Sequence, residues 1–293
     1  MERSYESSKV ILETMKKRHS CRVFQDKEIP KEILKDIIAT GIRAASGGNL
    51  QPYSIITISD KERKEELSKI CANQQFIRNA AVNLLFLLDW HKYDIYTREK
   101  RAPFACNRTY MHYIIGIEDV MCAAQSIETA AFLCGIGSCY VGTVVDAARE
   151  IGEFLKLPKL TYPVVMLSLG YPKQEGRLQE KLSQEVMVFN EEYGDLSNMD
   201  IINAYDEKYQ GKLMPLPQEE KLRTEALENF REALLTTYSM DEADEILEEA
   251  NITGFINETQ RRFGLHYNAS FMIEERKKNI EDLKEMGFHP FGD

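Results

Sequence analysis

The sequence predicts a domain that mixes α-helices with a buried β-sheet and continues into an acidic, helical C-terminal region. Two observations predict the sheet, because the apolar runs at 82–88 and 163–169 have the length and composition of strands buried on both faces. A third observation predicts helices, since apolar residues recur at helical spacing in the segments around these runs. At 293 residues the chain is long enough for one large domain or for a domain with an appendage.

Further elements follow along the chain. Over 31–41, Pro30 suits a first helical turn, apolar residues recur at helical spacing, and Gly41 can end the helix. The most apolar helix is expected over 117–134, where many small residues permit close packing. The remaining elements expected before residue 177 are helices over 7–17, 61–71 and 146–156 and a strand over 53–58.

The last third of the chain differs in composition. Glycine and proline break the chain at 211–217, an acidic helical segment follows over 218–250, and a short helix is expected over 277–286. We therefore expect a main domain over residues 1–190 and a helical arm over residues 191–293, because so small a unit would bury too little apolar surface to be stable alone. The apolar anchors that the arm is expected to bury are Tyr205, Phe255, Phe263 and Phe288.

Composition and charge exclude several classes of function. The net charge of −10 argues against a nucleic-acid surface as the main role. The six cysteines form no CxxC pair and the five histidines show no metal-ligand spacing, so we expect reduced thiols and no metal site. The N-terminus has no apolar run and no stretch reaches membrane length, so we expect a cytoplasmic protein without a signal peptide or a membrane span.

One short basic stretch carries the strongest chemical signal. It consists of Arg18-His19-Ser20-Cys21-Arg22, with two guanidinium groups four residues apart and a hydroxyl between them. Arginine presents a fixed fork of donors that matches phosphate oxygens, and serine and histidine add further donors. The stretch is a candidate phosphate cradle for a cofactor, and a basic helix end that complements its own dipole is the alternative.

Other polar residues and glycines favour a cofactor protein. The sequence has no G-x-S-x-G elbow, and the glycines of 135–142 lack the spacing of a dinucleotide loop. Without a nucleophile or an acid–base pair, the chemistry would belong to a bound cofactor. A flat, anionic cofactor fits, because Gly47 and Gly48 allow close approach of the backbone. Asn49 and Gln74 could meet the edges of its ring.

Five motifs in order resemble the nitroreductase family of FMN-dependent oxidoreductases, over approximately residues 8–190. The motifs are Arg18-His19-Ser20-x-Arg22 with Ile29-Pro30, Ala45-Ser46-x-x-Asn49-x-Gln51-Pro52-Tyr53, Asn73-Gln74-Gln75-Phe76-Ile77, Gly135-Ile136-Gly137-Ser138-x-Tyr140-Val141-Gly142, and Leu169-Gly170-Tyr171-Pro172 with Arg177. Each motif alone is weak, whereas the order and spacing of all five are specific for the family, though not for a substrate. The resemblance implies an α+β fold with a mixed β-sheet flanked by helices, and the C-terminal helical region would be an extension.

The resemblance also implies a homodimer with FMN sites at the subunit interface, for which the helix at 117–134 is the expected contact. The residues carried over for the phosphate and ribityl chain are Arg18, His19, Ser20, Arg22 and Arg177. Those carried over for the flavin ring and its ribityl hydroxyls are Gln74, Tyr140, Val141, Gly142 and Thr143. Those expected to reach the flavin of the other subunit are Ser46, Gly47, Gly48, Asn49 and Gln51.

The implied function is an FMN-dependent oxidoreductase that uses NADH or NADPH to reduce nitroaromatics, quinones or flavins by ping-pong hydride transfer. Flavin N5 would carry the chemistry, so no catalytic side chain is expected. We expect the arm to pack on the main body or the other subunit, with part of it covering the flavin face. Two alternatives stay open, namely another flavin reaction on the same fold, such as a dehydrogenation, and a non-catalytic flavin-binding or interaction protein. The sequence departs from the family pattern at Ala45 and Glu175, where proline and lysine are common.

Overall fold

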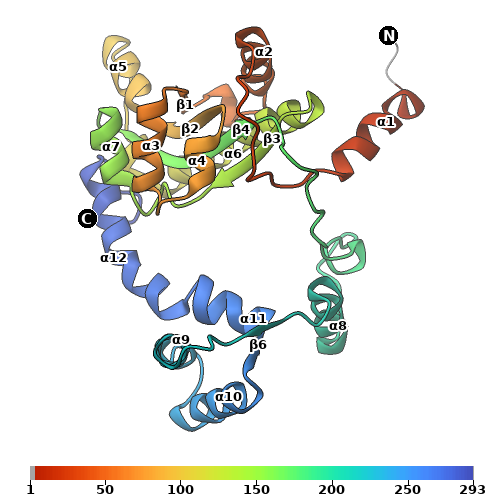
Figure 1. Cartoon of the computed structure of the whole chain (residues 1–293). Helices are drawn as coiled ribbons and strands as arrows, with labels where there is room; N and C mark the ends of the chain where they lie inside the picture. Colours follow the sequence, from red (N-terminus) through yellow and green to blue (C-terminus); the bar gives the residue numbers. More distant parts are fainter. Residues whose placement is uncertain (1–3, 293) are drawn as a thin grey trace. The chain divides into compact units, whose positions relative to one another are not determined.

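The computed structural model describes residues 4–292, which form two compact units (Figure 1). The first unit joins the chain up to Leu178 to the segment that begins at Asn279, and the second unit spans Gln179–Lys278. The expected domains over residues 1–190 and 191–293 stay a prediction, and the first compact unit also includes the segment from Asn279 onward. No helix within the described residues combines the length and apolar character needed to cross a membrane.

A four-stranded antiparallel sheet forms the centre of the first unit. Its strands, in spatial order, are β1 (Tyr53–Ile58), β2 (Val82–Asp89), β4 (Thr161–Gly170) and β3 (Gly137–Val141). Every residue of β2 is buried, as its apolar run predicts. A parallel bridge between Ser20 and Ser138 adds the N-terminal basic stretch to the edge at β3, so the expected mixed pairing occurs at this bridge.

Helices cover both faces of this sheet (Figure 1). One face packs against α3 (Lys61–Ile70), α4 (Gln75–Asn79) and α7 (Ala148–Leu155), and the other packs against α2 (Lys31–Gly41) and α6 (Tyr110–Leu133). Successive side chains of β2 point to opposite faces of the sheet. Leu85 and Leu87 pack in the core on the first face, and Leu84 and Phe86 pack in the core on the second. The contact between α2 and α6 requires a glycine, since a Cβ on Gly41 would lie 2.0 Å from Cγ1 of Ile127.

The remaining elements of the first unit lie at its margins. The helix α1 (Tyr5–Lys16) begins with a capping box at Ser4, and none of its described residues is buried. The helix α5 (His91–Glu99) follows β2 directly. The end of α12 (Ala269–Glu285) brings Phe288 into a core with Trp90 and Tyr162, so the expected burial of Phe288 is confirmed. Short 3-10 turns are η1 (Gly47–Asn49) and η2 (Cys106–Arg108).

The second unit consists mainly of helices around a small core of its own. Its elements are η3 (Gln184–Val186), α8 (Asn198–Tyr209), β5 (Leu213–Pro215), α9 (Glu220–Leu234), α10 (Met240–Thr253), β6 (Phe255–Asn257), α11 (Glu258–Arg261), a π-helix η4 (Arg262–His266) and the first part of α12. The acidic segment forms two helices because Ser239 starts α10 with a capping box. Three of the four expected anchors, Tyr205, Phe255 and Phe263, are 42%, 45% and 59% exposed in this chain.

The glycine-rich segment 135–143 contains a strand that local patterning does not predict. β3 is short, and it is completed by antiparallel pairing with β4 and by the bridge to Ser20. Gly137 allows the close approach, because a Cβ at this position would lie 2.7 Å from Cβ of Cys21. The pairing brings the basic stretch and the fourth motif to the same edge of the sheet.

Candidate functional site

The basic stretch lies along β3 instead of forming the end of a helix. α1 ends at Lys16, and the backbone N–H of Cys21 donates to the carbonyl of Ser138 at 2.7 Å. The backbone N–H of Arg18 still donates to Met15 in the last turn, but its guanidinium turns toward the acidic side chain of Glu128 on α6. The guanidinium therefore bonds a carboxylate and not the carbonyls at the helix end.

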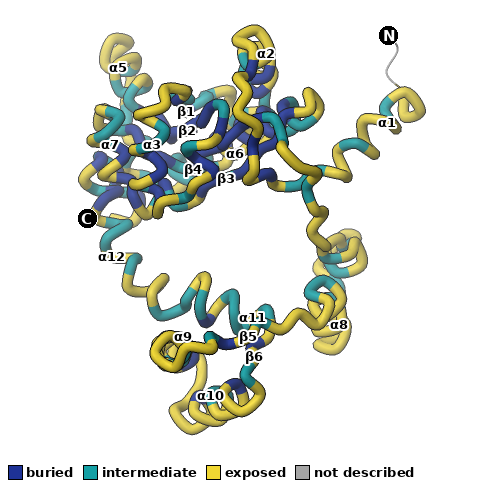
Figure 2. The backbone as a smooth tube through the Cα atoms, in the orientation of Figure 1, coloured by how far each residue is buried: buried dark blue, intermediate teal, exposed yellow. Residues whose placement is uncertain are grey.

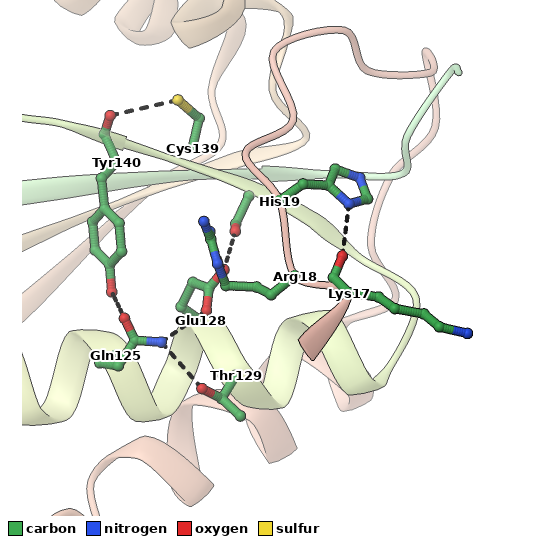
Figure 3. A network of polar contacts seen from close by, with 9 residues as sticks. Lys17, Arg18, His19, Gln125, Glu128, Thr129, Cys139 and Tyr140 are labelled. Carbon is green, nitrogen blue, oxygen red and sulfur yellow. Dashed lines mark hydrogen bonds and ion pairs between the residues drawn. The ribbon is translucent and has the colours of Figure 1, made fainter. Parts of the chain in front are cut away.

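A buried carboxylate fixes Arg18 beside this edge (Figure 3). Nη1 of Arg18 donates to Oε1 of Glu128 at 3.1 Å, and Oγ of Ser138 donates to the same oxygen at 2.8 Å. Nε2 of Gln125 donates to Oε2 of Glu128 at 2.9 Å. The side chain of Glu128 is fully buried while that of Arg18 is 32% exposed, and the bond to Glu128 uses one of the five N–H donors of the guanidinium.

Contacts with Lys17, Phe132 and Gly176 fix the orientation of the His19 ring. Its Nδ1–H donates to the carbonyl of Lys17 at 3.0 Å, and its ring meets Phe132 edge-on at 6.0 Å between centroids. A Cβ on Gly176 would lie 1.7 Å from Cδ2 of His19, so only glycine fits against the ring. This contact places the exposed Arg177, the next residue along the chain, near the basic stretch.

Arg22 lies next to the thiol of Cys139 on β3. Burial raises the pKa of this thiol, and the nearby guanidinium of Arg22 acts in the opposite direction. The side chain of Arg22 is otherwise exposed, and no ion pair holds it within residues 4–292. All six cysteines are free thiols, as their spacing predicts.

Gln74 connects α4 to the loop after β3. Its Nε2 donates to Oγ1 of Thr143 at 2.9 Å and to the carbonyl of Cys71 at 3.0 Å. Burial raises the pKa of the Cys71 thiol to about 11. A Cβ on Gly142 would meet nothing within 4 Å, so this part of the loop borders open space.

The structure therefore brings together most of the residues predicted for one cofactor site. The residues around the edge at β3 are Arg18, His19, Ser20, Arg22, Gln74, Tyr140, Val141, Gly142 and Thr143, with Arg177 beside them. The ring of Tyr140 is half-buried, and burial followed by the charge of Glu128 raises its pKa. We name this group the cradle.

The second motif forms a separate group around Asp119 on α6. Oγ of Ser46 donates to Oδ2 of Asp119 at 2.6 Å, and the N–H of Gly47 donates to Oδ1 at 2.9 Å. The N–H of Gln51 in turn donates to Oγ of Ser46 at 2.7 Å. Residues with positive φ shape the turn, namely Gly48, Asn49 and Gln51 at 56°, 55° and 47°. We name the segment 46–51 the clamp loop.

The cradle and the clamp loop lie on different sides of α6. Asp119 and Glu128 are nine positions apart along the helix. This spacing corresponds to about two and a half turns and about 14 Å of helix axis, so their side chains leave from opposite sides. Within one chain, the structure therefore does not bring Ser46, Gly47, Gly48, Asn49 and Gln51 to the cradle.

Sequence patterns missed the buried polar partners that hold both groups. Asp119, Glu128 and Ser138 are 4%, 0% and 2% exposed. A signal existed, because two acidic residues interrupt the most apolar helix on positions that face the protein. Metal-binding groups of three or more His, Cys, Asp and Glu side chains do not occur in the described part of the chain.

Comparison with known proteins confirms the family that the five motifs predict. The family model for the nitroreductase family matches residues 15–171. The chain is 30% identical over 213 residues to a NADPH-flavin oxidoreductase of Vibrio harveyi, which covers 73% of this chain and 86% of the relative.

Solved structures share the fold. Nitroreductase A from Vibrio parahaemolyticus matches 68% of this chain and 83% of its own at 30% identity and a TM-score of 0.63. The NADPH:FMN oxidoreductase of Vibrio harveyi, solved in complex with NAD+, matches 83% and 97% at 25% identity and a TM-score of 0.64. These matches agree with the α+β architecture and its C-terminal helical region. The chain belongs to the nitroreductase family.

Proposed function

We propose that this protein is an FMN-dependent oxidoreductase that uses NADH or NADPH to reduce nitroaromatics, quinones or flavins. The observation that carries the proposal is the convergence of cationic residues 18–22, Gln74 and residues 140–143 at one sheet edge in a nitroreductase-family chain. Bound FMN supplies hydride transfer at N5 of its ring, and the chain supplies binding and orientation. The names of the relatives from Vibrio harveyi support both the flavin and the nicotinamide donor.

The donor set of the cradle suits a flavin phosphate. Arg22 is exposed beside β3, the side chain of Arg18 is 32% exposed, and the exposed Ser20 adds a hydroxyl donor. At the other end, the open space at Gly142 leaves room for a flat ring against the backbone. In this assignment the phosphate lies near residues 18–22 with Arg177, and the ring lies near Gln74 and residues 140–143.

We propose further that the protein is a homodimer in which the clamp loop completes the cofactor site of the partner subunit. The position of the loop across α6 from the cradle supports this arrangement. The residues Val120, Ala124, Ile127 and Ala131 of α6 pack against the chain's own sheet and α2, so a dimer contact of this helix would use its exposed residues, such as Met121 and Leu133. The helix α1 offers an alternative contact, because five apolar residues of it are 41% to 76% exposed.

The absorbance spectrum of the purified protein tests the proposal. We expect yellow protein that releases FMN, and not FAD, on denaturation, and a flavin that is bleached by NADH or NADPH under anaerobic conditions. Oxidation of NADPH with menadione as acceptor then separates an enzyme from a non-catalytic flavin protein. Colourless protein that cannot be reconstituted with FMN would contradict the proposal.

A further inference from the structure

Two carboxylates are buried on α6, and each lies at the base of one half of the proposed site. Asp119 is 4% exposed and Glu128 is fully buried. Burying an ionised carboxylate is costly unless hydrogen bonds satisfy it. Both carboxylates are satisfied, and their donors come from segments far away in the sequence, 110 residues for Arg18 and 73 for Ser46.

Glu128 holds three segments of the chain together on the cradle side. Its two oxygens accept from Arg18 in the basic stretch, from Ser138 on β3 and from Gln125 on α6. Gln125 in turn accepts from the hydroxyl of Tyr140 at 3.5 Å, which extends the network toward residues 140–143 (Figure 3). Removing this carboxylate would free Arg18 and leave Ser138 without its acceptor.

Asp119 does the equivalent for the clamp loop, but without a cation. Its oxygens accept from the hydroxyl of Ser46 and the backbone N–H of Gly47. The hydroxyl of Ser46 in turn accepts from the backbone N–H of Gln51. The loop contains non-glycine residues at positive φ, a conformation that persists only where contacts determine it. Gly47 also packs tightly, because a Cβ there would lie 2.8 Å from Cγ2 of Ile115.

We propose that Glu128 and Asp119 are the positioning residues of two half-sites on one helix. Glu128 holds the cradle for the flavin of its own subunit, and Asp119 holds the clamp loop for the flavin of the partner subunit. The inference rests on the proposed FMN site and homodimer, and it adds that each residue acts on a different one of the two flavins. α6 therefore links the two cofactor sites of the dimer.

The two residues differ in the property that their loss changes. Glu128→Ala disorders the part of the cradle that binds the phosphate, so the affinity for FMN falls about tenfold to a hundredfold. Riboflavin lacks the phosphate, so its affinity falls less than about threefold. Asp119→Ala acts on the part of the site that contacts the ring, so the affinities for FMN and for riboflavin fall by the same factor. A merely structural role of both residues would not lower the ratio of FMN affinity to riboflavin affinity in one variant and leave it unchanged in the other.

Conservative variants sharpen this distinction. In Glu128→Gln, the amide oxygen accepts from Arg18 and Ser138, and a flip of the Gln125 amide restores its own contact, so most FMN affinity returns. In Asp119→Asn, one of the two acceptors becomes a donor that faces either Ser46 or Gly47, so recovery is smaller. Glu65→Ala serves as the control, because Glu65 pairs with Arg78 at 3.1 Å elsewhere in the first unit.

Mixed dimers test whether the residues act on different flavins. Subunits carrying Glu128→Ala and Asp119→Ala are unfolded, mixed, refolded with FMN and assayed for NADPH oxidation with menadione. Each mixed dimer contains one site with an intact cradle from one subunit and an intact clamp loop from the other. About half of the dimers are mixed, and half of the sites in these dimers are intact. We therefore expect the activity to exceed that of either parent variant by about a quarter of the wild-type activity.

The possible results distinguish a failure of this inference from a failure of the proposed function on which it rests. Activity that stays at the level of the two parents, with FMN-loaded dimers present, overturns the inference and leaves the proposed function standing. Wild-type protein that binds no FMN or stays monomeric overturns the proposed function itself. If Glu128→Ala does not fold, Glu128→Leu fills the volume without the carboxylate, and its mixture with Asp119→Ala gives the same two decisive results.

Discussion

The two units of the chain differ in what they bury. In the first unit, the core surrounds polar and charged groups as well as apolar side chains, and all nine buried polar or charged residues of the described chain lie there. In the second unit, the core consists of six buried apolar residues, and most of its backbone is coloured as exposed or intermediate (Figure 2). Its charges pair near the surface, as Arg231 does with Asp244. Buried polar groups need complete hydrogen-bond networks, so they mark the unit in which a site is built.

This difference supports a division of labour. We propose that the first unit binds the cofactor and that the second unit restricts which oxidants react with it. Four predictions test the division, from the largest expected effect to the smallest.

The largest effect is expected where the end of the chain joins the first unit. Phe288 is 1% exposed, so Phe288→Ala should lower the free energy of unfolding by about 3–5 kcal/mol. Phe263 is 59% exposed, and Phe263→Ala should change it by less than about 0.5 kcal/mol. Urea unfolding followed by circular dichroism measures both. Equal losses would show that the C-terminal segment does not belong to the core of the first unit.

The core of the second unit gives the next effect. Phe230 is 2% exposed and packs against Gly264, where a Cβ would lie 2.3 Å from its ring. Phe230→Ala should destabilise the second unit by about 3 kcal/mol. Because this unit holds no part of the cradle, the yield of bound flavin should stay at the wild-type level while the KM for the oxidant changes. Wild-type kinetics with every oxidant tried would instead favour a partner-binding role for the acidic helices.

Loss of a cradle cation should weaken FMN without unfolding the protein. If Arg22 makes charge-assisted bonds to the phosphate, they contribute about 1.5–3 kcal/mol, and Arg22→Ala should bind FMN about tenfold to a hundredfold more weakly. Arg18→Ala should weaken FMN binding similarly, but it should also lower the free energy of unfolding, because it removes a donor from the fully buried carboxylate of Glu128. Lys208→Ala in the second unit is the matched control. Fluorescence titration of apoprotein with FMN measures the affinity, and wild-type values for both arginine variants would remove the phosphate role of the basic stretch.

The smallest effect is a pH dependence of the second unit. The hydrogen bond from Arg261 lowers the pKa of Glu258 from 4.5 to about 2. Because the pKa in the folded state is depressed, this pair stabilises the unit above pH 4.5, and the contribution is lost as the pH falls toward 2. Glu258→Gln should remove about 1 kcal/mol or less at neutral pH and flatten this part of the acid unfolding curve. The exposed Glu248→Gln should leave the curve unchanged.

Local patterns predicted much of the fold. The strand at 53–58 and the helix at 31–41 have the predicted bounds, and the apolar runs became β2 and β4. The prediction was incomplete at β3, whose five residues gain their order from pairing with β4 and not from their own alternation. The acidic segment was predicted as one helical stretch, whereas the structure breaks it over residues 235–239, between the end of α9 at Leu234 and the cap residue Ser239 of α10.

The sequence by itself determined the donors of the site, because phosphate chemistry requires particular side chains and those stand in order at Arg18, Ser20 and Arg22. It also determined the family, through five motifs whose order is independent of their positions in space. Only the tertiary structure decided that Glu128 holds Arg18, that Asp119 holds Ser46, and that the cradle and the clamp loop lie on opposite sides of α6. The physical reason is that hydrogen-bond partners 110 and 73 residues apart are selected by the packing of whole elements, which no local periodicity encodes.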